Sequence, residues 1–207
     1  MYICKNFKNN IMNKDYWNAR YNSGLTSGAG SYGKLAKFKA KVLNEFVKNN
    51  NVKSVIELGC GDGNQLSLCN YPKYIGIDTA EKAVKICKDI FKGDKTKKFK
   101  TEYKNETAEL VISLDVLFHL VELEDWKQYL NQLFTASTKY VIIYSSNAEP
   151  DPNVKYGLHF KLRPFTDYIA ENFKDFRFIK QIINQYPYNP EKPTETSMSN
   201  FYIYEKK

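Results

Sequence analysis

The chain has 207 residues and 43% hydrophobic content, the size and composition of one globular domain. It contains no apolar run of the ~20 residues that span a bilayer and no signal-peptide core, so we expect a cytoplasmic protein without a membrane partner. The net charge of +8 comes mainly from scattered lysines. The densest run, residues 92–100, is expected to be a solvated loop and strand edge, so we do not expect a nucleic-acid partner.

The cysteines show neither a C-x-x-C spacing nor the density of a disulfide scaffold. We therefore expect reduced thiols at Cys4, Cys60, Cys69 and Cys87. The sequence carries no metal-binding motif, and no metal ion is expected. It does not indicate an oligomeric state.

The sequence predicts a single domain in which residues 1–34 form an N-terminal arm or lid packed on the main body, residues 35–207. The arm carries aromatic side chains followed by a glycine-rich stretch, residues 23–33. We expect these aromatics to form an apolar wall, and the glycines to let the arm close over a pocket. The arm side chains assigned to substrate binding are Tyr16, Trp17, Tyr21, Ser31 and Tyr32. The alternative is that the arm only packs on the edge of the sheet.

Helical and strand patterns alternate through the rest of the chain, as βαβ units require. We predict helices over residues 35–47, 80–91, 122–137 and 164–173. We predict strands over residues 54–58, 73–77, 99–103, 110–114, 140–145, 176–183 and 200–204. This order indicates a doubly wound α/β fold: a seven-stranded, mostly parallel sheet with an antiparallel edge strand and helices on both faces.

The first strand runs into three glycines with the spacing G-x-G-x-G, at Gly59, Gly61 and Gly63. Glycines there let the backbone turn sharply and approach a ligand that a Cβ atom would exclude. A helix is expected to follow and to aim its free N–H groups at that ligand. The spacing differs from the G-x-G-x-x-G of dinucleotide-binding proteins.

Acidic residues accompany this turn. Glu57 lies two residues before the first glycine, and Asp78 ends the next strand about 20 residues on, where an acid hydrogen-bonds a ribose diol. Taken alone, Glu57 has a structural interpretation as a buried acid that caps loop amides, and Asp78 as the N-cap of the following helix. A third element, residues 110–120, ends a strand with Asp115 and carries His119.

The three elements, in this order, resemble motifs I and IV and the ribose-binding acid of class I S-adenosylmethionine (SAM) dependent methyltransferases of the small-molecule type. The resemblance covers about residues 50–145 and implies SAM as cofactor. The residues assigned to SAM on this basis are Glu57, Gly59, Cys60, Gly61, Gly63, Gln65, Asp78, Thr79, Leu114 and Asp115. Glu102, Tyr103 and Asn105 remain alternatives for the contact with adenine.

Methyl transfer to a hydroxyl group needs a base, and the chain has only two histidines. We therefore assign His119 and His159 as catalytic candidates, with Asp115 as a substitute. Arg163, in a basic loop, is a candidate to grip a carboxylate or phosphate of the acceptor. The alternatives are a structural His119 and an Arg163 that lies in a solvated loop.

The sequence thus predicts a SAM-dependent methyltransferase acting on a small polar acceptor, anionic or sugar-like, with O-methylation favoured. The alternatives are an RNA or protein methyltransferase and a non-catalytic SAM-binding protein. The absence of an N/D-P-P-Y/F signature after residue 113 argues against methylation of nucleic-acid amino groups.

Overall fold

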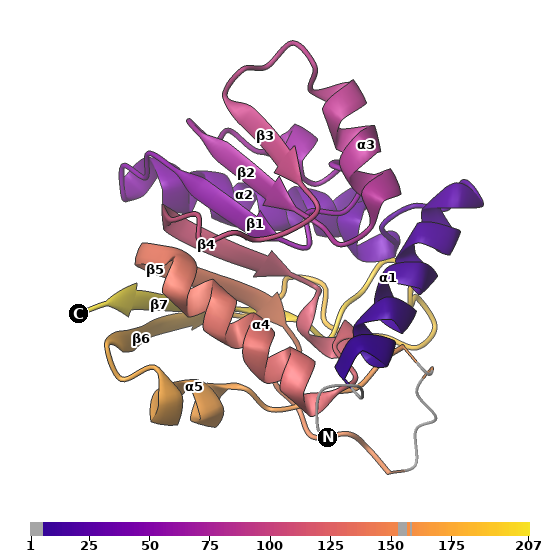
Figure 1. Cartoon of the computed structure of the whole chain (residues 1–207). Coiled ribbons are helices and arrows are strands. Elements are labelled where there is room, and N and C mark those ends of the chain that lie inside the picture. The colour runs from indigo at the N-terminus through magenta and orange to yellow at the C-terminus, as the bar shows by residue number, and fades with distance from the viewer. Residues whose placement is uncertain (1–5, 153–156, 158) are drawn as a thin grey trace.

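The computed structural model describes residues 6–152, 157 and 159–207 (Figure 1). The helices are α1 (Asn6–Asn22), α2 (Gly33–Asn49), α3 (Glu81–Ile90), α4 (Leu123–Ala136) and α5 (Thr166–Asn172). The strands are β1 (Val55–Leu58), β2 (Tyr74–Ile77), β3 (Lys97–Lys100), β4 (Ala108–Leu114), β5 (Ser137–Ser145), β6 (Phe176–Ile182) and β7 (Asn200–Lys206). The short 3₁₀ helices are η1 (Ala29–Ser31), η2 (Leu66–Leu68) and η3 (Leu117–His119).

The strands of the described residues form one seven-stranded sheet in the order β3-β2-β1-β4-β5-β7-β6. The strands from β3 to β5 are parallel, and Ile56 of β1 lies between Ile75 of β2 and Val111 of β4. The strand β7 runs antiparallel to both β5 and β6, so antiparallel pairing is confined to this side of the sheet. The predicted fold class is confirmed.

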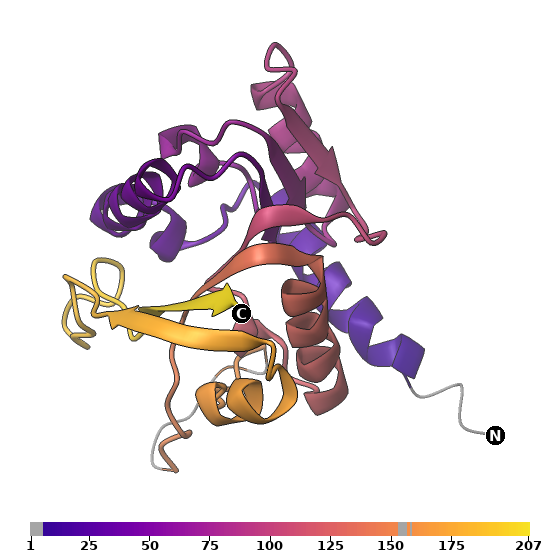
Figure 2. The same cartoon turned by 90° about the vertical axis from the view of Figure 1, so that its left-hand side faces the viewer.

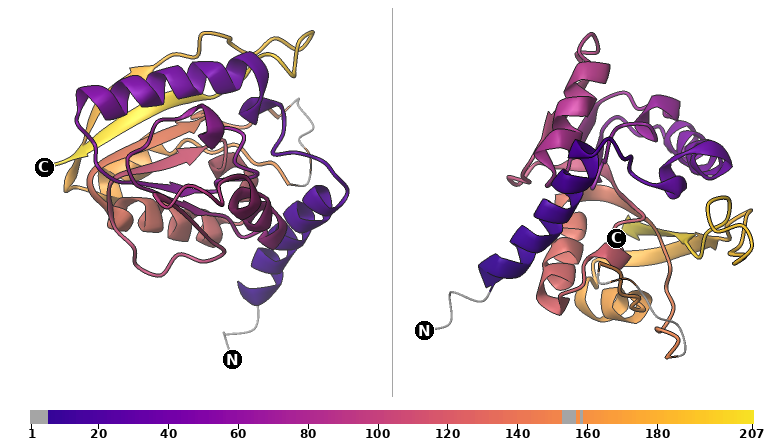
Figure 3. Two further views of the ribbon diagram at one scale, coloured as in Figure 1. Left: turned by 90° about the horizontal axis from the view of Figure 1, so that it is seen from above. Right: turned by 90° about the vertical axis from the view of Figure 1, so that its right-hand side faces the viewer.

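Helices cover both faces of the sheet because successive strand residues point to opposite sides. Leu110 and Ile112 of β4 pack with buried residues of α2 and α3, whereas Val111 packs with buried residues of α4 and α5. Figure 2 and the left panel of Figure 3 show α2 and α4 on opposite sides of the sheet. Burying both faces explains why the central strands are continuously apolar.

The N-terminal arm contains α1, which packs against α3 and lies beyond the carboxyl ends of the parallel strands (Figures 1 and 3). Tyr21 is buried with Ala80 and Ala83, and Trp17 packs beside them. The arm is thereby held over the edge of the sheet where ligands bind in open α/β folds.

Two predicted elements differ in the structure. The helix expected after the glycine turn is wrong: only η2 follows, and the chain is extended again by Cys69. Pro72 and the start of β2 at Tyr74 leave no room for more helical turns. The third strand is β3, Lys97–Lys100, rather than residues 99–103, because its register is set by pairing with β2.

Cys60, Cys69 and Cys87 are buried free thiols, whereas Cys4 lies outside the described residues. No helix in the described part of the chain combines the length and the apolar character needed to cross a membrane.

Phe134 of α4 tests the packing of this layer. Its buried ring contacts Phe173, Phe176 and Tyr204, with ring centroids 4.3, 4.9 and 5.5 Å away. We expect Phe134→Ala to lower the free energy of unfolding by about 3–5 kcal/mol, because the ring leaves a cavity. Urea denaturation measures this change. The control is Phe178→Ala, which removes a half-exposed ring that also faces Tyr204 and should cost under about 1 kcal/mol. Equal losses would contradict the assigned core.

Candidate active site

The turn after β1 brings the backbone against the N-terminal arm, α3 and the segment after β4. Gly59, Gly61 and Gly63 all have positive φ, at 83°, 58° and 80°, a region that favours glycine. A Cβ atom at Gly59 would overlap the side chain of Val116, and one at Gly61 would overlap the hydroxyl oxygen of Ser27. The glycines are therefore required by close packing as well as by the turn itself.

Asp78 ends β2 and holds this turn. Its Oδ2 accepts a hydrogen bond from the Gly61 N–H at 2.9 Å, and its Oδ1 accepts one from the Ala80 N–H at 2.9 Å. Burial raises the pKa of Asp78. Two of the roughly four acceptor positions of an ionised carboxylate are thus used, and the others remain for a ligand hydroxyl.

Glu57 lies in the buried part of β1. Its Oε2 accepts a hydrogen bond from the Tyr74 hydroxyl at 2.6 Å, so it joins β1 to β2 rather than contacting the loop amides. Burial raises the pKa of Glu57 to about 7, because a charged carboxylate is poorly solvated there.

The end of β4 carries Asp115 in a left-handed conformation, with φ of 59°. The ammonium of Lys39 in α2 donates to its Oδ2 at 2.8 Å, and the hydroxyl of Ser199 donates to its Oδ1 at 2.8 Å. The carboxylate is therefore held between elements that are far apart in the sequence.

The two histidines lie together beside the arm. His159 accepts, through its carbonyl oxygen, a hydrogen bond from His119 Nδ1 at 3.0 Å, and the two rings are nearly parallel with centroids 5.8 Å apart. Tyr16 stacks on His159 at 4.5 Å, and Trp17 meets His119 edge-on at 5.1 Å. Burial lowers the pKa of His119.

Asp62, inside the glycine turn, ties the arm to it. The Ser27 N–H donates to Asp62 Oδ2 at 2.8 Å, and the Asp62 N–H donates to Ser27 Oγ at 2.9 Å. The Tyr32 hydroxyl donates to the same Oδ2 at 2.9 Å, and the Tyr21 hydroxyl lies 3.0 Å from Ser27 Oγ. Asp62 occupies a variable position of G-x-G-x-G, so no sequence pattern indicates this role.

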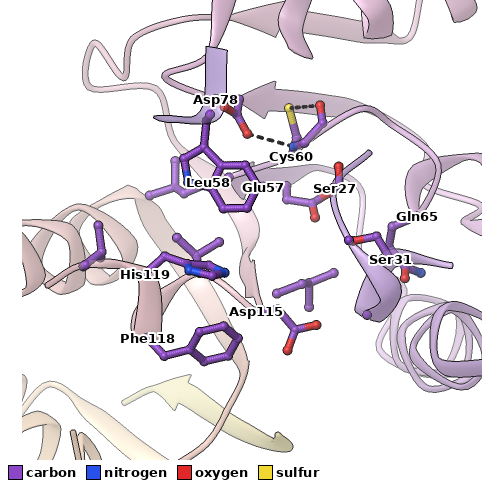
Figure 4. A pocket seen from close by; sticks show the side chains of 18 of the residues that line it. Ser27, Ser31, Glu57, Leu58, Cys60, Gln65, Asp78, Asp115, Phe118 and His119 are labelled. Atoms are coloured by element: carbon purple, nitrogen blue, oxygen red, sulfur yellow. Dashed lines mark hydrogen bonds between the residues drawn. The ribbon is translucent and has the colours of Figure 1, made fainter. Parts of the chain in front are cut away.

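The glycine turn, Glu57, Asp78, Asp115 and His119 line one cavity of about 680 Å³ at the carboxyl edge of the sheet. Figure 4 shows His119 and Phe118 on one side, Asp78 and Cys60 on another, and Asp115 near the middle. The residues predicted for the cofactor all line it except Gly63. The other predicted residues that line it are Trp17, Tyr21, Ser31 and His119.

Several predicted residues lie elsewhere. Tyr16, Tyr32 and His159 are outside the cavity lining. Tyr16 packs on Trp17 and His159 bonds to His119, both of which line the cavity, and Tyr32 bonds to Asp62 in the turn beside it. Arg163 is not placed to grip an acceptor: it donates to the carbonyl oxygens of Leu120 (2.6 Å) and Val121. These two bonds hold the segment after η3, which is a structural role.

The lining also includes residues that the sequence left as alternatives and others that it did not indicate. Glu102 and Tyr103, two of the three candidates for adenine, line the cavity with Thr101, whereas Asn105 does not. The loop between β6 and β7 contributes a further wall of the cavity. Further lining residues are Gly30, Lys39, Phe118, Asp125, Phe160, Tyr188, Met198 and Ser199.

The cavity is acidic although the chain is basic. Five carboxyl groups line it, against one ammonium among the described residues, that of Lys39; the carboxyl groups are those of Glu57, Asp78, Glu102, Asp115 and Asp125. Nowhere in the described residues do three His, Cys, Asp or Glu side chains gather closely enough to hold a metal ion.

A family model described as a methyltransferase domain matches residues 32–187. No curated protein matches the chain. Among solved structures, the magnesium protoporphyrin IX methyltransferase of Synechocystis PCC 6803 with bound SAM is similar, at 14% identity, over 97% of this chain and 98% of that one, with a TM-score of 0.69.

Two further structures have the same fold. The N-methyltransferase NodS from Bradyrhizobium japonicum WM9, in complex with S-adenosyl-L-homocysteine (SAH), is 10% identical over 96% of this chain and 99% of that one, with a TM-score of 0.64. The methyltransferase domain of bacterial CtHen1 is 20% identical over 82% of this chain and 98% of that one, with a TM-score of 0.60.

Gly61→Ala tests the close approach at the turn. We expect it to weaken binding of the predicted cofactor at least ~10-fold, because the added methyl group displaces Ser27 and the turn. Gly24→Ala is a matched control: Gly24 also has a positive φ, of 78°, but nothing lies within 4 Å of the new methyl group. Calorimetry with SAM and SAH measures both variants, and equal affinities would reject the assigned site.

Glu57→Gln tests the buried acid. The unfolded chain releases this proton near the ordinary value of 4.5, whereas the folded pKa is about 7. Between these values the folded state binds more protons, so wild-type stability should fall as pH rises. The free energy of unfolding of Glu57→Gln should therefore rise relative to that of the wild type, by on the order of 3 kcal/mol between pH 4.5 and 8. Urea denaturation without ligand measures this, with exposed Glu124→Gln as control. A constant difference across this range would contradict the assignment.

Proposed function

Because the chain belongs to the methyltransferase-domain family, we propose that it transfers a methyl group from SAM to a small polar acceptor, with an oxygen atom as the favoured position. The observation that supports this best is the single cavity at the carboxyl edge of the sheet, which joins the glycine turn, Asp78, Asp115 and His119. Ligands bind at this edge in open α/β sheets.

The residues of the cavity fit SAM. The glycine turn lies beside Asp78, whose remaining acceptor positions suit the ribose hydroxyls, and Glu102 and Tyr103 lie where adenine contacts are expected. SAM carries a sulfonium and an ammonium, and the excess of carboxyl groups in the cavity matches these charges. When bound, SAM supplies an electrophilic methyl carbon.

The acceptor is expected beyond Asp115, between η3 and the loop that joins β6 to β7. Phe118 and Phe160 pack together there with centroids 4.7 Å apart. Tyr188 and Met198 line the cavity with side chains that are 51% and 39% exposed, so they offer apolar surface to a ligand. Because the cavity is acidic and Arg163 is engaged elsewhere, a neutral acceptor, such as a sugar, fits better than an anionic one.

His119 is proposed as the base that removes the proton of the acceptor hydroxyl. A carbonyl oxygen only accepts hydrogen bonds, so the contact with His159 requires a proton on Nδ1 of His119. Its Nε2 is then the basic nitrogen, and its lowered pKa keeps it neutral near pH 7. His159 lies outside the cavity lining and positions His119 through its carbonyl group.

The second candidate is N-methylation of a small amine. The observation that favours it is the acidic cavity, which would attract a cationic acceptor. The similar NodS fold belongs to an N-methyltransferase.

The described lining has no cationic side chain besides Lys39 to contact a nucleic-acid phosphate, so this cavity gives methylation of RNA no specific support.

The test is incubation with labelled SAM and separate pools of neutral, cationic and anionic metabolites, followed by mass identification of the product. We expect a neutral product. With that acceptor, His119→Ala should retain SAM affinity and lose ~10²-fold or more in turnover. The turnover of the wild type should decrease at pH values below the pKa of His119. His159→Ala keeps the carbonyl that His119 contacts and should lose much less. An exclusively anionic product would contradict the proposal, and so would near-normal turnover of the double variant His119→Ala/His159→Ala.

A further inference from the structure

Lys39 is an unusual residue for the middle of an amphipathic helix. Its side chain is 1% exposed and forms a 2.8 Å ion pair with Asp115, 76 residues along the chain. Its ammonium also lies 5.2 Å from the centre of the Tyr144 ring. A buried ion pair costs desolvation that its own attraction does not always offset, so its presence at a cavity calls for a functional reason.

The pair fixes the carboxylate of Asp115 in one position. Lys39 holds Oδ2 and Ser199 holds Oδ1, each at 2.8 Å. From the arm, Gly30 approaches so closely that a Cβ there would lie 2.9 Å from Oδ2. Asp115 itself has a left-handed backbone, a conformation that costs energy in a non-glycine residue and that clusters at functional sites.

Asp115, unlike Lys39, is open to the cavity. Its side chain is 18% exposed, and only two of its roughly four acceptor positions are used by Lys39 and Ser199. Lys39 lines the cavity with a side chain that is only 1% exposed, and its ammonium is already paired with Asp115, so Asp115 is the more accessible of the two. The ligand group that this arrangement accommodates is therefore a hydrogen-bond donor, and a cation would gain most from it.

We propose that Asp115 binds the α-ammonium of the amino-acid end of SAM, and that Lys39 is the positioning residue that holds Asp115 for this contact. Asp115 is the first residue after β4, next to Val116, which packs on Gly59 of the glycine turn. It therefore joins the cofactor side of the cavity. This inference rests on SAM as the cofactor and is independent of the acceptor.

Two ligands separate this role from a purely structural one. SAH carries the same amino-acid end as SAM, whereas 5′-methylthioadenosine keeps the adenosine and sulfur but lacks the ammonium and carboxylate. We expect Asp115→Asn to weaken SAH binding at least ~10-fold and binding of 5′-methylthioadenosine less than ~2-fold. Lys39→Met should show the same selectivity with a smaller loss of SAH affinity. Calorimetry measures both ligands.

Two further variants serve as controls. Lys34→Met removes another ion pair of α2, the exposed one to Glu195, and should leave both affinities unchanged. Lys39→Met/Asp115→Asn removes both charges, so it avoids an unpaired buried charge and should resemble Asp115→Asn alone. Equal losses for the two ligands, or unchanged SAH affinity in Asp115→Asn, would overturn the inference. Wild-type protein that binds neither ligand would instead refute SAM as the cofactor.

Discussion

The close approach of four chain segments at Gly61 is the constraint on which the site depends. Its N–H donates to Asp78, its carbonyl oxygen accepts from the Cys87 thiol at 3.2 Å, and Ser27 occupies the space of the missing Cβ. One residue thus connects β2, α3 and the arm to the turn after β1. A side chain at this position would displace Ser27 and strain a backbone with positive φ, so it would disturb the wall of the cavity next to the cofactor.

The same architecture separates the basic surface of the protein from its acidic cavity. The lysines that give the chain its net charge of +8 lie mainly outside the cavity, where pairs such as Lys14–Glu81 and Lys85–Asp89 are exposed and contribute little to stability. Strands β1, β2 and β4 instead bring Glu57, Asp78 and Asp115 to one cavity, where partial burial makes charge act more strongly than at the surface. The local sign therefore governs ligand choice more than the net charge does.

The parallel sheet and the core of the site could be predicted because both follow from short-range patterns. Apolar strand runs define the sheet, and residues at strand ends must meet at one edge, which brought Asp78, Asp115 and His119 together as predicted. The site residues that were missed depend on long-range contacts. Lys39 has the spacing of the buried face of α2, four residues after Leu35 and four before Leu43, but a lysine there is expected to reach solvent. Asp62 has no pattern that names Ser27 as its partner.

Differences between the sequence interpretation and the structure have similar causes. A helix after the glycine turn is usual for this spacing, but Pro72 shortens the segment to η2. Arg163 has the chemistry to bind an anion, yet two carbonyl oxygens of the chain receive its donors. Side-chain chemistry alone does not reveal which backbone groups compete for it.

The arm joins the cofactor side of the cavity to the acceptor side. At one end Ser27 is bonded to Asp62 in the glycine turn, and at the other Tyr16 stacks on His159 while Trp17 packs against His119. His159 in turn accepts the Nδ1 hydrogen bond that sets the tautomer of His119. Seating of the arm on the turn and orientation of the proposed base are therefore parts of one packed unit. The proposed base therefore packs directly against the arm that lines the cavity, so the same contacts that shield this side of the cavity from water also bear on the orientation of His119.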